Sequence, residues 1–146
     1  WDEQYLYLTA RIPRAAGGSR VELAENRYYD EPHADRDRLE IQLDTDRDLS
    51  TAFRLCVDES GRTSESCWAL SSWNPRWHVA VDQEDSVWRV ELAIPARELA
   101  AGGIRPGALW AIDVRRLLPG RVDQRPEAMV SDSQTRTLLV RFARDR

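Results

Sequence analysis

Apolar and polar residues alternate with a period of two along most of this chain. Because successive side chains of a β-strand point to opposite faces, each alternating segment predicts a strand with one apolar and one polar face. The alternating segments are residues 5–12, 39–44, 53–58, 77–81, 88–94, 110–115 and 137–142. Turn-forming residues separate these segments. The pattern predicts an all-β fold, an antiparallel β-sandwich with jelly-roll or immunoglobulin-like layers.

Helix signals are few, and one short helical turn is expected. Pro95 stops the preceding strand and can open a helical turn, since it lacks a backbone N–H and its φ suits a first helical position. Good helix formers follow over residues 96–101, and Gly102-Gly103 closes the turn. Loops are expected over residues 15–38, 71–76 and 119–134, and long loops in a compact domain are often functional.

The length of 146 residues suits a single domain over residues 1–146. Hydrophobic residues make up 42% and charged residues 32%, which is typical of a folded globular domain rather than a disordered segment. The net charge of −4 disfavours nucleic acid as a partner, because binding to phosphates needs a basic surface. No apolar run approaches the roughly 18 residues of a membrane helix, so no membrane span is expected.

Two cysteines, Cys56 and Cys67, flank a turn-rich stretch. A two-residue loop between Ser60 and Thr63, with Gly61 first, would place the cysteines directly opposite each other. Opposed cysteines can reach disulfide distance, and a disulfide would indicate an oxidising compartment. The alternative is a pair of reduced, partly buried thiols.

Four segments of the chain carry motifs. They read W-D-E-Q-Y-L-Y-L over residues 1–8, D-R-L-E-I-Q-L-D over 37–44, W-R-V-E-L-A-I-P over 88–95 and G-A-L-W-A-I-D-V-R-R over 107–116. In this order they resemble the "W-D-D-x-x-L-Y", "D-x-V-E-I-F-L-D", "W-x-x-E-x-A-I-P" and "G-x-x-W-x-x-N-x-x-R" segments of the family 9 carbohydrate-binding modules and their DOMON-like relatives. The resemblance implies a β-sandwich that binds polysaccharide ends or short sugars. Because that family begins about a strand upstream of the first motif, the resemblance also implies a domain excised from a longer protein.

The resemblance also assigns two sugar-contacting residues. The Glu of the "V-E-I-F" strand and an Arg on the following strand reach sugar hydroxyls in binding members, and they map onto Glu40 and Arg54. From the residues alone, the two form an ion pair between neighbouring strands, which contributes little stability when exposed. The family's stacking aromatic ahead of this strand has no counterpart in residues 31–36.

Aromatic residues in the loops are the other candidates for sugar contact, because sugars stack on flat exposed rings with polar groups at the edge. The candidates are Trp73, Asn74, Arg76 and Trp77 and, in the first long loop, Tyr28 and Tyr29. Asn74-Pro75 marks a surface turn, which favours exposure of Trp73. The alternative is that Trp77 alternates inward and Trp73 staples the loop. Trp88 and Trp110 share faces with aliphatic residues and are expected in the core.

An acidic loop offers a metal site. Asp44, Asp46 and Asp48 alternate, and three converging carboxylates suit Ca²⁺, which prefers six to eight oxygen ligands. The resemblance adds support, since the family carries structural cations. The alternative is a solvated acidic hairpin tip.

Catalysis is not expected. A glycosidase needs two carboxylates across a cleft, and Glu40 and Glu91 are candidates that also have ordinary places on strand surfaces. Haem is a different class of ligand, because some DOMON-like relatives bind it through Met with His or Lys. Here His33 or His78 with Met129 would have to serve.

The sequence therefore predicts non-catalytic binding of a poly- or oligosaccharide. The domain would act as a module of a secreted, periplasmic or cell-surface protein, beside other domains of the same parent chain. A structural or protein-interaction sandwich that has lost the sugar site is the alternative, and a haem-binding domain is the third possibility.

Overall fold

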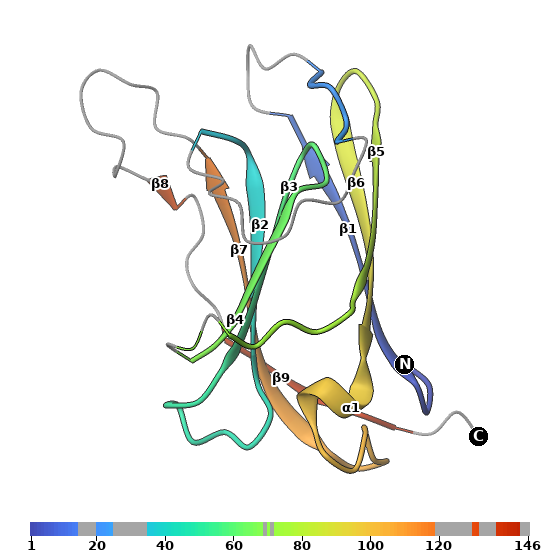
Figure 1. Ribbon diagram of the computed structural model, residues 1–146, viewed down its shortest axis with the longest axis vertical. Coiled ribbons are helices and arrows are strands. Elements are labelled where there is room, and N and C mark those ends of the chain that lie inside the picture. Colours follow the sequence, from blue (N-terminus) through green and yellow to red (C-terminus); the bar gives the residue numbers. More distant parts are fainter. Residues whose placement is uncertain are drawn as a thin grey trace.

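The computed structural model describes residues 1–14, 20–24, 35–68, 70, 72–118, 130–131 and 137–143. Within these residues two antiparallel sheets pack face to face as a β-sandwich (Figure 1), which confirms the predicted fold class. The first sheet has the strand order β1-β6-β5, and the second has the order β4-β3-β2-β7-β8, with β9 also pairing with β7. The elements are β1 (Tyr5–Pro13), β2 (Arg38–Asp44), β3 (Phe53–Asp58), β4 (Thr63–Cys67), β5 (His78–Gln83), β6 (Val87–Pro95), α1 (Ala96–Leu99), β7 (Leu109–Leu118), β8 (Val130–Ser131) and β9 (Leu138–Arg141).

The apolar faces of the strands meet between the two sheets and form the core. Trp88 of β6 and Trp110 of β7 are both buried there, as their alternation with polar residues predicted. Aliphatic side chains fill the rest of the core. Fully burying one valine, leucine or isoleucine side chain contributes about 1.5–3 kcal/mol, so the core is the main source of stability. The polar faces of both sheets are left pointing outward.

The helical turn forms where it was predicted, at the lower end of the sandwich in Figure 1. Pro95 precedes it, the N–H of Ala96 donates to the carbonyl of Gln4, and both Ala96 and Leu99 are buried. The turn ends at Leu99 because Ala100 is already extended, so it is two residues shorter than the sequence indicated. No helix in the described part of the chain is long and apolar enough to cross a membrane.

The hairpin between β3 and β4 corrects the predicted disulfide. Val57 pairs with Thr63, so Cys56 lies opposite Ser64 rather than Cys67, and both thiols are free. The N–H of Asp58 donates to the carbonyl of Arg62, which leaves a three-residue loop over residues 59–61. Gly61, with a φ of 91°, takes the left-handed position that ends such a loop.

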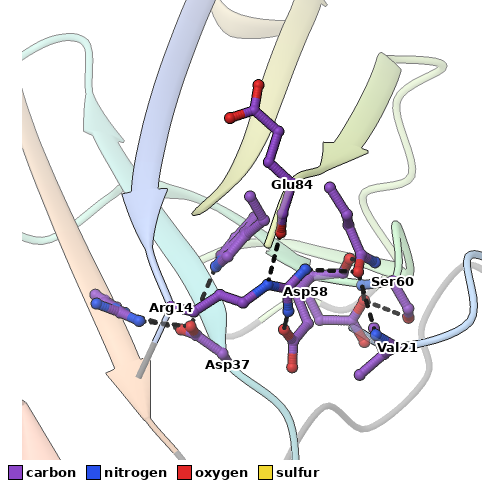
Figure 2. Close-up of polar contacts among 10 residues, drawn as sticks. Arg14, Val21, Asp37, Asp58, Ser60 and Glu84 are labelled. Atoms are coloured by element: carbon purple, nitrogen blue, oxygen red, sulfur yellow. Dashed lines mark hydrogen bonds and ion pairs between the residues drawn. The ribbon is translucent and has the colours of Figure 1, made fainter. Parts of the chain in front are cut away.

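A buried carboxylate just before β2 joins the two sheets (Figure 2). Asp37, just before β2, accepts a hydrogen bond of 3.1 Å from the indole Nε1–H of Trp88 in the opposite sheet. Its two oxygens also accept bonds of 3.0 and 2.6 Å from the guanidinium of Arg116 at the end of β7. Asp37, Trp88 and Arg116 come from three of the four sequence motifs, so those motifs meet in one contact.

A second buried cluster beside it holds the hairpin tips together. The Arg14 guanidinium, which follows β1, donates to Glu59 at 3.0 Å, to Gln83 at 2.7 Å and to the carbonyl of Glu84 at 3.1 Å (Figure 2). Burial raises the pKa of Glu59. One arginine thereby connects the end of β1 to the β3–β4 and β5–β6 hairpins.

Candidate functional site

The outer face of the second sheet is polar, and we refer to it as the polar face. The strand register places its side chains in two rows across β4, β3, β2 and β7. The rows are Ser66, Arg54, Gln42 and Asp113, and Ser64, Cys56, Glu40 and Arg115. The face therefore presents carboxylates, guanidinium groups, an amide and hydroxyls side by side.

The two residues assigned by resemblance are neighbours on this face. Glu40 Oε1 lies 3.9 Å from Nε of Arg54, and the side chains are 17% and 55% exposed. A contact of this length between partly exposed groups is weak, and it leaves hydrogen-bonding positions on both side chains facing outward.

The neighbouring charges are held more tightly. Arg115 donates to Oδ2 of Asp113 through Nε at 2.8 Å and Nη2 at 2.6 Å. This contact raises the pKa of Arg115, so its positive charge is secure. Asp113 is only 7% exposed, and its Oδ1 has no hydrogen-bond partner within the part of the chain that the structure describes. This oxygen is itself buried, so it does not add a position to which a ligand could bind on the polar face.

Trp68 supplies an exposed indole next to the polar face. It follows Ser66 by two residues just past the end of β4, and its N–H donates to the carbonyl of Ala52 at 2.7 Å. Of the six tryptophans, all of them described, it is the most exposed, at 64%. Sequence reasoning did not single it out. The available signal was its place just after the turn-rich hairpin that contains β4.

The aromatic platform predicted from the loop needs correction. Trp77 is fully buried, and its Nε1–H donates to Glu65 at 3.0 Å, so its ring offers no surface to a ligand. Trp73 is half-buried because it packs on Phe53, with ring centroids 4.8 Å apart. Both therefore follow the inward alternative. Between them, Asn74 and Arg76 are exposed.

Other predicted residues fall outside the described residues or stay apart. Tyr28, Tyr29, His33 and Met129 lie outside the described part. His78 is exposed on β5, where its ring centroid lies 5.8 Å from that of Tyr5. The two carboxylates considered for catalysis point from opposite faces of the sandwich, Glu40 from the second sheet and Glu91 from the first. These two cannot flank one glycosidic bond.

The acidic loop after β2 brings its three carboxylates together, with oxygens of Asp44, Asp46 and Asp48 all within 4.8 Å of one another. The loop also uses these oxygens itself. Asp44 accepts backbone N–H bonds from Arg47 and Leu49, and Asp48 accepts bonds from the two residues after Leu49. Such bonds hold the pKa of Asp48 well below its usual range. The calcium site stays a prediction.

Comparison with known proteins adds the fold family. No family model and no curated protein matches this chain. Among solved structures, a family 9 carbohydrate-binding module from Caldicellulosiruptor kristjanssonii in complex with cellotriose superposes with a TM-score of 0.56 and 16% sequence identity. The same kind of module from that organism in complex with glucose superposes with a TM-score of 0.55 and 17% identity. The matches cover 81% and 80% of this chain, which spans about half of each solved chain, 54% and 55%.

The chain has the fold of a family 9 carbohydrate-binding module. Within this family 9 fold, the motifs that suggested the resemblance have a structural role, because Asp37, Trp88 and Arg116 join the two sheets. Glu40, in the second motif, instead lies on the polar face. In this chain the motif residues on the inside join the two sheets, whereas a ligand would be recognised by residues on the outside.

Proposed function

We propose that this domain binds carbohydrate without catalysing a reaction, and that the polar face holds the sugar. The observation that carries the proposal is the set of outward-facing donors and acceptors on β3, β2 and β7, centred on Glu40 and Arg54. We further propose that the domain serves as a module of a secreted or cell-surface protein, acting beside other domains of the same chain.

The chemistry of the polar face suits a polyol. Each sugar hydroxyl both donates and accepts, so a site for it needs both kinds of group within reach. Glu40 accepts, Arg54 donates, and Gln42 does both. Hydrogen bonds to charged groups contribute about 1.5–3 kcal/mol each, more than bonds between neutral groups.

Trp68 would supply the apolar part of the site. One face of a pyranose carries C–H groups, and an exposed indole beside a polar rim is the usual surface for stacking it. Trp68 is exposed and follows Ser66, which pairs with Arg54, by two residues. It would take the stacking role predicted for Trp77, which is fully buried, and for Trp73, which is half-buried against Phe53.

The solved neighbours suggest which class of ligand to test first. One was determined with cellotriose and the other with glucose, so β-linked glucose oligosaccharides are the first ligands to test. A non-catalytic role agrees with the separation of Glu40 and Glu91 on opposite faces, since hydrolysis needs two carboxylates about one bond.

Isothermal titration calorimetry with cellotriose tests the proposal. We expect saturable binding by the wild type and a loss of about tenfold or more in affinity for Glu40→Ala, Arg54→Ala and Trp68→Ala. Arg97→Ala is the matched control, because Arg97 is an exposed arginine on α1, and it should bind as the wild type does. Absence of binding to cellotriose, glucose and a broad glycan panel would favour the structural or protein-interaction alternative.

A further inference from the structure

The outer face of the first sheet contains a hollow that the proposed site does not use. Its volume is about 400 Å³, within the range of roughly 300–1,000 Å³ that small-molecule sites occupy. The register places Tyr7, Ala93 and His78 side by side across β1, β6 and β5, and Thr9, Glu91 and Ala80 in the next row. The two alanines form the floor of the hollow between longer neighbours.

Hydrogen bonds fix the position of Tyr7, an aromatic side chain that lines this hollow. Tyr7 is 48% exposed, and its hydroxyl donates to Oδ2 of Asp2 at 2.7 Å. Oδ1 of Asp2 accepts the backbone N–H bonds of Gln4 and Tyr5, both at 2.7 Å, so the carboxylate is itself anchored. The bond to Asp2 raises the pKa of Tyr7 above its ordinary value.

The rings continue from Tyr7 toward the other edge of the sheet. The ring centroids of Tyr5 and Tyr7 lie 6.1 Å apart, and those of Tyr5 and His78 lie 5.8 Å apart at 60°. The rings of Tyr7 and His78 therefore line one end of the hollow, and the exposed carboxylate of Glu91 lies at the other end with the hydroxyl of Thr9. The hollow combines an apolar wall that is already positioned with a charged acceptor.

We propose that this hollow is a second carbohydrate subsite, in which a pyranose stacks on Tyr7 while its hydroxyls donate to Glu91. A pyranose matches the hollow because it has one C–H face for the ring and hydroxyl groups at its edge. The choice of ligand rests on the proposed function of the domain, but the subsite uses none of the residues of the polar face. Because the two faces point in opposite directions, one domain would hold two glucan chains, or two parts of one chain.

Two-dimensional ¹H–¹⁵N NMR with added cellotriose tests the subsite. In the wild type we expect saturable shifts of the backbone amides of Thr9, Ala80, Glu91 and Ala93, separate from any shifts on the polar face. Tyr7→Ala should lower the affinity measured from these shifts by about tenfold. Tyr7→Phe, which keeps the ring, should largely retain that affinity.

A second variant distinguishes loss of the subsite from loss of the fold. Ala80→Leu fills the exposed floor of the hollow, removes no hydrogen bond and should also abolish the shifts on this sheet. Glu40→Ala should leave them unchanged. Shifts confined to the polar face, or shifts on the first sheet that survive both Tyr7→Ala and Ala80→Leu, would overturn the second subsite and leave the proposed function standing. Shifts confined to the first sheet would support the subsite and refute the polar face as the binding site. No shifts anywhere with cellotriose, glucose or the broad glycan panel would refute both.

Discussion

Removing the Asp37 carboxylate is expected to destabilise the fold more than any change of an exposed charge. Asp37 is 6% exposed and accepts hydrogen bonds from both Trp88, in the opposite sheet, and Arg116. In Asp37→Ala the indole N–H of the fully buried Trp88 loses its acceptor. An unsatisfied buried donor costs about 1–3 kcal/mol.

The loss of the ion pair adds to this cost. Breaking a buried pair by removing one partner costs about 3–5 kcal/mol in total. The Arg116 side chain is 24% exposed, so water can solvate part of its charge, and the lower end of that range applies. We therefore expect a loss of about 3 kcal/mol in the free energy of unfolding, which corresponds to a fall in Tm of roughly 10 °C for a domain of this size.

Urea denaturation followed by far-UV circular dichroism measures the effect. Asp85→Ala is the control, because the side chains of Asp85 and its partner Arg20 are 96% and 58% exposed, and it should change stability by less than about 0.5 kcal/mol. Asp37→Asn keeps one acceptor oxygen and should fall between the two variants. If Asp37→Ala loses less than about 1 kcal/mol, the contact does not hold the sheets together and the reasoning is refuted.

Three further predictions concern other residues. Burial raises the pKa of Cys56 to about 12, so in native Cys67→Ala protein at pH 8 iodoacetamide should leave the remaining thiol unmodified and react with it only after unfolding, as mass spectrometry would show. Trp73→Ala should cost about 3 kcal/mol in urea denaturation through lost packing on Phe53, yet leave cellotriose affinity unchanged; a selective loss of binding would restore its predicted role in the site. The lowered pKa of Asp48 means that its hydrogen bonds stabilise the fold above pH 3.8, its ordinary value, and that this stabilisation fades as the pH falls further. The Tm difference between wild type and Asp48→Ala should therefore shrink below that pH. A difference that stays constant would contradict the lowered pKa of Asp48.

The sandwich could be predicted from the sequence because burial follows from alternation alone. Trp88 and Trp110 alternate with polar residues, and both lie in the core. The helical turn could also be predicted from neighbouring residues, since Pro95 has no N–H to continue the hydrogen bonds of the β-sheet. These features depend only on a residue and its near neighbours in the chain.

The register of the β3–β4 hairpin could not be read in the same way. Gly61 indicated a tight turn correctly, but a glycine with positive φ fits the first position of a two-residue loop as well as the last position of a three-residue loop. Hydrogen bonds from the N–H groups of Ser60 and Arg62 to the side chain of Asp58 favour the longer loop. A side-chain contact of this kind moved Cys56 and Cys67 out of register.

The site residues were predicted less well, because exposure depends on partners far away in the chain. Trp73 is half-buried because Phe53 lies beneath it, and twenty residues separate the two. Trp68, by contrast, has a φ of 54°, a conformation rare for a bulky residue, just past the end of β4, where its ring remains exposed. No periodicity in the sequence signals either outcome.

The division between inside and outside also explains why the fold was easier to predict than the ligand. Asp37, Trp88 and Arg116 belong to the motifs and join the two sheets of this chain. A chain can keep all of them and still carry any set of side chains on its outer faces, because outward residues do not enter the core. The identity of the ligand is therefore decided by Glu40, Arg54 and their neighbours, whose substitution should change binding while leaving the fold intact.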